Sequence, residues 1–436
     1  MKKISGTILL TAIFLLTACG KKVGRDVDSS REVNTESVQT SNHTMDVKTE
    51  SASETAEVTT KEKKKAGKNI PDEVFFETTD NVEVYENLSV AELITNTNAE
   101  LTEPEKKIKT DELGECSVNI SFDYEGISYE KEITYNVSDT TQPIILNMGW
   151  SPYTIIDEPF DLSSIVGYAD NYDRSPELSY TGEVNTSEYG AYPITATVTD
   201  SSGNSTSWDM DVFVVSEIPA PEDNNTRVNF SDFMDYYCYE NVSYGIDVSA
   251  WQTNVDYEKV KEQGCEFVIM RMGYCYSEIK KDDYYDRNME NASAAGLDIG
   301  VYFYTTANTE KKAREQARWI IEQLDGRQLD YPVAFDWEEW GQFQKYGMNI
   351  RDLNEIFEAF CDELEKNGYS GMLYSSKNFL NNFWDNKKNR TVWLAHYVDE
   401  TDYDGEFSIW QASAYGRIEG IDGDVDMNIR LNDMPV

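Results

Sequence analysis

The chain has 436 residues, and at about 150 residues per domain this length predicts two or three folded units. Hydrophobic residues make up 40% of the sequence and aromatic residues 12%, so most of the chain can bury a core. The 38 Lys and Arg residues against 80 Asp and Glu residues leave a formal charge of −42, and no basic stripe could neutralise phosphates, which argues against nucleic acid as a partner.

The first residues have the pattern of an export signal. Two lysines precede an apolar stretch from Ile8 to Leu16, which small residues follow. The run Leu16-Thr17-Ala18-Cys19 resembles the lipobox of bacterial lipoproteins, and predicts a signal peptide over 1–18 and lipidation of Cys19. Acyl chains on Cys19 would hold the protein on the outer face of the bacterial cell membrane. The alternative is an ordinary secreted protein cut near Ala18.

Residues 19–69 are expected to be the lipidated cysteine and a disordered polar tether. From Val23 to Lys68 the chain has no aromatic residue, Leu, Ile or Pro, so it cannot bury enough surface to offset its ordering entropy.

Five more cysteines follow, and their odd number without any CxxC spacing predicts no disulfide framework. We expect small, buried apolar side chains at these positions, which are Cys116, Cys238, Cys265, Cys275 and Cys361.

Two stretches with a period of two predict all-β modules over 70–138 and 139–216. Apolar residues alternate with polar ones from Val118 to Val137 around a Glu125-Gly126 turn, and again from Ile194 to Val214 around a turn at 200–204. Two hairpins this far apart suggest tandem β-sandwich repeats. The second resembles bacterial Ig-like surface modules. Either a passive stalk or a glycan- or protein-binding role would suit such modules, and fold alone favours the stalk.

A segment with prolines and asparagines predicts a linker over 217–243, and the C-terminal unit over 244–436 then alternates strand and helix. We expect an irregular TIM-like barrel of five βα units followed by three strands. The clearest helical face runs from Leu353 to Leu364 and ends at Asn367-Gly368. The expected strands contain Ile246–Val248, Phe267–Met270, Ile299–Tyr304, Val333–Phe335, Met372–Tyr374, Val392–Ala395, Phe407–Trp410 and Asp424–Met427.

Carboxylates are the candidate catalytic groups of this unit. The chain has only two histidines, His43 and His396, far apart in sequence, which argues against imidazole metal cages and Ser-His-Asp catalysis. Acidic residues fall where strands of the barrel end. Side chains at i and i+2 of one strand share a face, so Asp336 and Glu338 are crowded together. Crowding raises one pKa and leaves the other group ionised, as glycoside hydrolysis requires. These acids are Asp247, Asp336, Glu338 and Asp426.

Each acid alone has a simpler interpretation. Asp336 and Glu338 could form a solvated strand end, Asp247 a helix N-cap or turn, and Asp426 an Asx turn. An ordered set of motifs around them favours the catalytic interpretation. The set comprises YGIDVSAWQ at Tyr244–Gln252, FVIMRMG at Phe267–Gly273, Asp282-x-x-Tyr285-x-x-Asn288, GVYFY at Gly300–Tyr304, PVAFDWE at Pro332–Glu338, WLAHY at Trp393–Tyr397, Trp410-Gln411, and GRIEGIDGDVDMN at Gly416–Asn428.

Together these motifs resemble glycoside hydrolase family 25, the N-acetylmuramidase lysozymes, over the whole 244–436 unit. The resemblance implies that Glu338 is the general acid and that Asp336 orients or polarises the substrate acetamido group, with Asp247 and Asp426 as the remaining acids of the pocket. It also implies hydrolysis of the β-1,4 bond between N-acetylmuramic acid and N-acetylglucosamine in peptidoglycan, with net retention and without metal or cofactor. The nucleophile is either a carboxylate or the acetamido oxygen of the substrate.

Aromatic residues near the strand ends could stack on sugar rings, or they could belong to the barrel core. These candidates are Trp251, Tyr302, Tyr304, Trp393, Tyr397 and Trp410. Two positions depart from the family pattern. Phe303 stands where a histidine is frequent, and Thr253 stands where Gly is usual, so the resemblance is weaker for subsite detail than for the acids.

Two functions are compatible with the sequence. The first is a monomeric, membrane-anchored muramidase that cuts peptidoglycan glycan strands. The alternative is a non-catalytic surface lipoprotein that binds glycan through a lysozyme-like barrel. Because all four acids are present, the sequence favours the enzyme.

Overall fold

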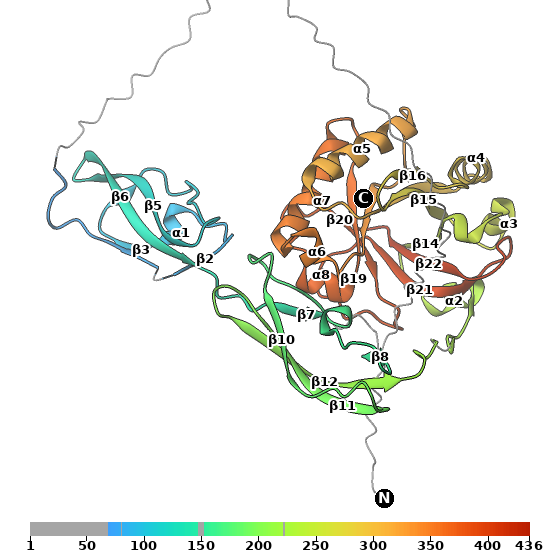
Figure 1. Ribbon diagram of the computed structural model, residues 1–436. Coiled ribbons are helices and arrows are strands. Elements are labelled where there is room, and N and C mark those ends of the chain that lie inside the picture. The colour runs from blue at the N-terminus through green and yellow to red at the C-terminus, as the bar shows by residue number, and fades with distance from the viewer. Residues whose placement is uncertain (1–68, 80, 147–151, 221–222) are drawn as a thin grey trace, which may run out of the picture. The chain divides into compact units, whose positions relative to one another are not determined.

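The computed structural model describes residues 69–79, 81–146, 152–220 and 223–436, and it divides the chain into two compact units that meet between Ser138 and Asp139 (Figure 1). The predicted signal peptide, Cys19 and most of the predicted tether lie outside the described residues. Among the helices that the structure describes, none is both long enough and apolar enough to cross a membrane.

The unit that ends at Ser138 is built around the first predicted hairpin, which the structure confirms. Strands β5 (Gly114–Tyr124) and β6 (Ile127–Ser138) pair antiparallel, and Val118, Ile120 and Phe122 point into the core. Glu125 and Gly126 form the turn with φ of 46° and 79°, the left-handed geometry that a two-residue hairpin needs. The other elements are β1 (Phe76–Thr78), β2 (Val82–Glu83), α1 (Val90–Leu93), β3 (Ile94–Thr97) and β4 (Glu100–Leu101).

A second β module opens the other unit. Its hairpin is also confirmed, with β11 (Gly190–Thr199) and β12 (Ser205–Val215) in a register that pairs Ile194 with Met210. One sheet has the order β10-β11-β12-β8 and a smaller one pairs β7 with β9. The remaining elements are β7 (Ile144–Leu146), β8 (Tyr153–Ile155), the 3-10 helix η1 (Leu162–Ser164), β9 (Gly167–Ala169) and β10 (Glu177–Gly182). The Ig-like assignment of both modules stays a prediction.

The predicted C-terminal barrel of strands is present and closes on itself. The ring runs β14-β15-β17-β18-β19-β20-β21-β22, and β22 returns antiparallel between β21 and β14. The other neighbours in the ring are parallel, so their carboxyl ends share one rim. The strands are β14 (Val242–Val248), β15 (Phe267–Cys275), β17 (Asp298–Thr305), β18 (Val333–Trp337), β19 (Gly371–Ser376), β20 (Thr391–Ala395), β21 (Ile409–Arg417) and β22 (Val425–Leu431).

Helices between these strands bury their apolar faces against the ring. Helix α7 (Ile350–Glu365) buries Leu353, Phe357 and Leu364 as predicted, and the chain leaves it through Gly368 at φ 83°. The other elements are η2 (Ala250–Gln252), α3 (Tyr257–Glu262), β16 (Ile279–Lys281), α4 (Tyr285–Ala295), α5 (Glu310–Leu324), α6 (Phe343–Tyr346) and α8 (Lys377–Asn382).

The segment predicted as a linker over 217–243 contributes to the barrel. Its second half forms β13 (Val228–Asn229), which pairs with β21, and α2 (Phe230–Tyr236). Phe230 and Phe233 share one face of this helix and are buried in the barrel core. The prolines and asparagines before residue 226 indicate a break in regular structure, but they carry no information about the apolar pair that follows.

The second β module packs on the barrel through the loop after β9. The backbone N–H of Ile350 donates to the Asp170 carbonyl at 2.8 Å, and the Asn349 side chain donates to the Tyr172 carbonyl at 2.6 Å. Arg174 makes two hydrogen bonds of 2.7 Å to the Asp352 carboxylate. Predicting this module and the barrel as separate domains missed the docking because it depends on side chains about 180 residues apart.

The five cysteines within the described residues are free thiols. Cys265 and Cys361 are buried as expected, whereas Cys238 is exposed and Cys116 and Cys275 are partly exposed. The prediction of uniformly buried side chains is therefore wrong. The number and spacing of cysteines bear on pairing and do not determine burial.

Phe233→Ala should lower the free energy of unfolding of the barrel by about 3–5 kcal/mol, because it empties a fully packed site. Asp235→Ala, on the exposed side of α2, should change it by less than about 0.5 kcal/mol. Seven of the nine tryptophans lie in 244–436, so tryptophan fluorescence during urea unfolding reports on the barrel. Equal effects of the two substitutions would mean that α2 is not part of the barrel core.

Candidate active site

Four acidic side chains come to the carboxyl-end rim of the barrel from three strands. Asp247 lies near the end of β14, Asp336 near the end of β18 with Glu338 just beyond it, and Asp426 at the start of β22. Because β22 runs antiparallel, its first residues reach the rim where the parallel strands end. These are the four acids that the sequence analysis selected.

Strand pairing places the first two acids face to face. Asp247 and Asp426 are direct register partners across β14 and β22. The Oδ2 atom of Asp247 accepts hydrogen bonds from Gln411 Nε2 and Asn428 Nδ2, both at 2.8 Å. Two neutral donors on one oxygen favour the ionised form of Asp247, although the side chain is buried.

The other pair lies on β18 and its extension. Asp336 is buried and its Oδ1 atom has no hydrogen-bond partner, while Glu338 is partly exposed at the rim. Trp337 lies between the two acids in sequence and points to the opposite face of the strand, where its indole N–H donates to the Ala307 carbonyl at 3.0 Å. An unpaired carboxylate oxygen in a buried position is costly, and such groups mark functional sites.

Burial raises the pKa of every acid of this group. The pKa of Asp247 rises to about 6 against the opposing effect of its two amide donors, and the pKa of Glu338 rises to about 7 through burial and the charge of Glu339. Burial and the Glu338 charge place the pKa of Asp336 well above its usual range, although Arg271 opposes this. Burial and the Asp247 charge do the same for Asp426. The four acids therefore hold protons at higher pH than free carboxyl groups do.

One cation lies within electrostatic reach of Asp336. Arg271 on β15 donates from Nε to Asp282 Oδ2 at 2.8 Å and stacks over the Tyr274 ring, 5.4 Å from its centroid. Asp282 is buried and also accepts the backbone N–H groups of Ala250 and Tyr284. Asp282 thus positions Arg271, a role that the sequence analysis did not assign although it quoted both residues within motifs.

Gln411 is a second positioning residue that received no role from the sequence. Its Oε1 accepts the hydroxyls of Tyr374 and Tyr397 at 2.9 and 2.7 Å, and its Nε2 reaches Asp247. Asn428 connects the indole N–H of Trp393 to the same carboxylate. Buried amide side chains need hydrogen-bond partners, and this requirement is the signal that could have identified Gln411 and Asn428.

The aromatic candidates separate into two groups. Trp251 on η2 is 72% exposed, and Tyr302, Tyr304 and Tyr397 are partly exposed at the rim. Trp393 and Trp410 are only 2% exposed, which favours packing over sugar stacking for these two rings. Stacking by the first group stays a prediction.

Thr253 shows why glycine is expected after the Trp-Gln pair. It follows η2 with φ of 52°, in the left-handed region that a β-branched residue seldom adopts. The segment that carries Trp251 therefore ends on a strained residue.

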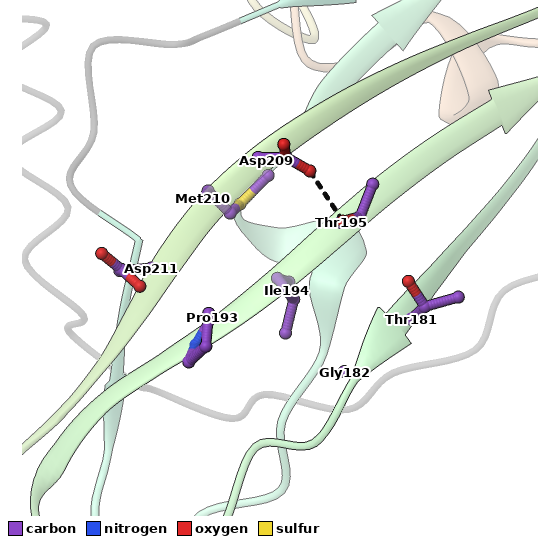
Figure 2. A pocket seen from close by; sticks show the side chains of 8 residues that line it. All are labelled: Thr181, Gly182, Pro193, Ile194, Thr195, Asp209, Met210 and Asp211. Carbon is purple, nitrogen blue, oxygen red and sulfur yellow. Dashed lines mark hydrogen bonds between the residues drawn. The ribbon is translucent and has the colours of Figure 1, made fainter.

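A separate hollow of about 630 Å³ lies on the second β module (Figure 2). Its lining comes from β10, β11 and β12, and the side chain of Thr195 donates to Asp209 at 2.7 Å along its edge. Gly182 permits the close approach there, since a Cβ at this position would lie 2.6 Å from the Pro193 carbonyl oxygen. None of the four rim acids lines this hollow, so the chemistry belongs to the barrel.

Comparison with known proteins relates the barrel to a family of glycoside hydrolases. The family model "Glycosyl hydrolases family 25" matches residues 246–421. The autolytic lysozyme of Clostridium acetobutylicum is 30% identical over 188 residues, which cover 42% of this chain and 54% of that protein. The uncharacterized protein YegX of Escherichia coli K12 is 28% identical over 228 residues, 47% of this chain and 80% of that protein. The crystal structure of a lysozyme from Streptomyces coelicolor aligns with 43% of this chain and 90% of its own at 24% identity and a TM-score of 0.36.

A rim of crowded carboxylates on a barrel that matches this family defines a glycoside hydrolase. Residues 246–421, the range that matches the family model, contain Asp247, Asp336 and Glu338, and the barrel extends past the matched range to include Asp426.

Asp336→Asn should stabilise the protein while it damages the site. A carboxyl whose pKa is raised by folding destabilises the folded state as pH rises from the unfolded pKa through the folded one. The substitution should therefore have little effect on unfolding at pH 4.5 and add on the order of 1–3 kcal/mol at pH 8, where it removes a buried negative charge. Urea unfolding at both pH values measures this, with Glu322→Gln on the exposed side of α5 as the control. A gain that does not grow with pH would contradict the burial argument.

Proposed function

We propose that the protein is a muramidase, which hydrolyses the β-1,4 bond between N-acetylmuramic acid and N-acetylglucosamine in peptidoglycan. The observation that carries this proposal is the meeting of four acids with raised pKa values at one rim of a family 25 domain. The relative from Clostridium acetobutylicum, named an autolytic lysozyme, supports the substrate.

Glu338 is the general acid of this proposal. Its pKa of about 7 keeps a substantial protonated fraction at neutral pH, and its partial exposure lets it reach a leaving-group oxygen. Asp336 interacts through its charge with Glu338 and Arg271, and it orients the acetamido group of the substrate. Ionised Asp247 stabilises the positive charge that develops on the sugar, and Asp426 carries the proton of this pair.

The proposed stereochemical outcome is net retention. It requires either a carboxylate nucleophile or attack by the acetamido oxygen of the substrate, and both routes produce an intermediate that water opens with Glu338 acting as base. The exposed Trp251 and the rim tyrosines Tyr302, Tyr304 and Tyr397 would stack on the sugar rings.

Glu338→Gln should lower kcat/KM on purified peptidoglycan by about 10²–10⁴-fold, because a neutral amide cannot donate the proton that the leaving group needs. The assay measures release of reducing muramic acid ends by the full chain. The exposed Glu322→Gln control on α5 should keep wild-type activity.

Equal background release by the wild type and by Glu338→Gln would refute the muramidase. It would favour the alternative of a non-catalytic barrel that binds glycan, provided that both proteins still sediment with peptidoglycan.

We also propose that the protein is held at the outer face of the cell membrane through lipid on Cys19. The run Leu16-Thr17-Ala18-Cys19 supports this attachment. The formal charge of −42 also supports a lipid anchor, because an anionic wall or membrane surface does not attract such a chain.

Cys19→Ser should move the protein from the detergent phase to the aqueous phase in Triton X-114 partition of whole cells, because no acyl chain can then be attached. Cys116→Ser, a change at another cysteine, should leave the protein in the detergent phase. Unchanged partition of Cys19→Ser would remove the lipid anchor from the proposal.

A further inference from the structure

A second group of buried acids lies in the second β module, at the loop that docks on the barrel. Asp139, Asp170 and Asp200 come from three separate segments, before β7, after β9 and after β11. Each offers one carboxylate oxygen, and these oxygens lie within 4.8 Å of one another. The three side chains are 5%, 1% and 6% exposed.

Asp170 has an oxygen that nothing in the described structure satisfies. Its Oδ1 accepts the backbone N–H groups of Tyr172 and Asp173 at 2.9 and 2.6 Å, whereas its Oδ2 is fully buried without a hydrogen-bond partner. The amide of Asn171 shows the same feature. Its Nδ2 donates to Asp139 Oδ1 at 3.3 Å, and its own Oδ1 is buried and unpartnered. Two buried acceptors without donors indicate a missing positive group.

The donors identified at Asp170 and Asp200 are all neutral. Asp200 accepts the backbone N–H groups of Ser202 and Asn204 and the Asn204 amide, at 2.8–2.9 Å. The nearby Arg174 pairs with Asp352 across the docking interface. Burial, with the charges of Asp139 and Asp200, raises the pKa of Asp170 to about 6. Carboxylates that are buried this close together repel one another, and a bound cation would remove that repulsion.

The chemistry of the group selects the cation. All candidate ligands are oxygens, which hard cations prefer and which zinc sites seldom use alone. Calcium–oxygen distances are about 2.3–2.6 Å, so oxygens on opposite sides of one Ca²⁺ are at most about 5.2 Å apart, and three carboxylate oxygens that all lie within 4.8 Å of one another can bind the same ion. Mg²⁺ requires a tighter octahedron with distances of about 2.0–2.1 Å.

We propose that Asp139, Asp170 and Asp200 form a calcium site that fixes the docking of the second β module on the catalytic barrel. The loop that follows Asp170 is also the docking loop. The Asp170 carbonyl accepts from Ile350, the Tyr172 carbonyl accepts from Asn349, and Arg174 pairs with Asp352. A cation on the Asp170 carboxylate therefore orders the backbone that caps the beginning of α7.

Calcium binding to the full chain, after removal of metal with EDTA, tests the site by isothermal titration and by thermal unfolding. We expect one Ca²⁺ per chain and a rise in Tm of about 5 °C at 100 times the Kd. Asp170→Asn should weaken binding at least about 10-fold and reduce the Tm rise. Asp209→Asn, at an exposed acid of the same module, should bind as the wild type does. Mg²⁺ should give a smaller Tm shift at equal concentration.

Terbium supplies a second readout if Asp170→Asn does not fold. Tb³⁺ bound to the wild type should luminesce through energy transfer from nearby tyrosines such as Tyr172, and Ca²⁺ should displace it with the Kd from titration. Absence of Ca²⁺ binding by the wild type would overturn the proposal, and so would binding that Asp170→Asn leaves unchanged. Both readouts are independent of muramidase activity, so the two proposals can fail separately.

Discussion

The antiparallel return of β22 between β21 and β14 is the constraint on which the site depends. It closes the ring, and it places Asp426 opposite Asp247 at the end where the parallel strands terminate. A parallel last strand would present its own carboxyl end there and send Asp426 to the far side of the barrel. The irregular last third of the barrel is therefore the part that completes the acidic rim.

Buried carboxylates repel one another both at the rim and at the docking loop, and the repulsion is reduced differently in the two places. At the rim, repulsion among carboxylates is reduced by shared protons, by amide donors on Asp247 and by Arg271, whose position Asp282 fixes. That arrangement leaves titratable groups near neutrality, which acid–base catalysis uses. At the docking loop, the three buried carboxylates lie close enough to bind one ion, and in our proposal a bound cation balances their charge in place of shared protons.

The parts of the fold that could be predicted from sequence are those with a local period. The hairpins around Gly126 and Gly203, the face of α7 and the strands of the barrel follow from alternation and turn residues. The four acids followed from motif order, because strand ends carry them to one rim. The need of a buried amide for partners applies to Gln411 and Asn428, but it does not say which partners they have, since other strands supply them.

The docking of the second β module was also beyond local reasoning, and it has a consequence for the site. The loop after β9 caps α7, and α6 lies directly before α7 in the chain. Tyr346, the last residue of α6, donates to Glu339, and the other oxygen of Glu339 accepts from Tyr304 at the rim. Glu339 in turn raises the pKa of Glu338 by its charge. Adjacency in the chain, two hydrogen bonds and the charge of Glu339 thus lead from the docking interface to the group that we assign as the general acid.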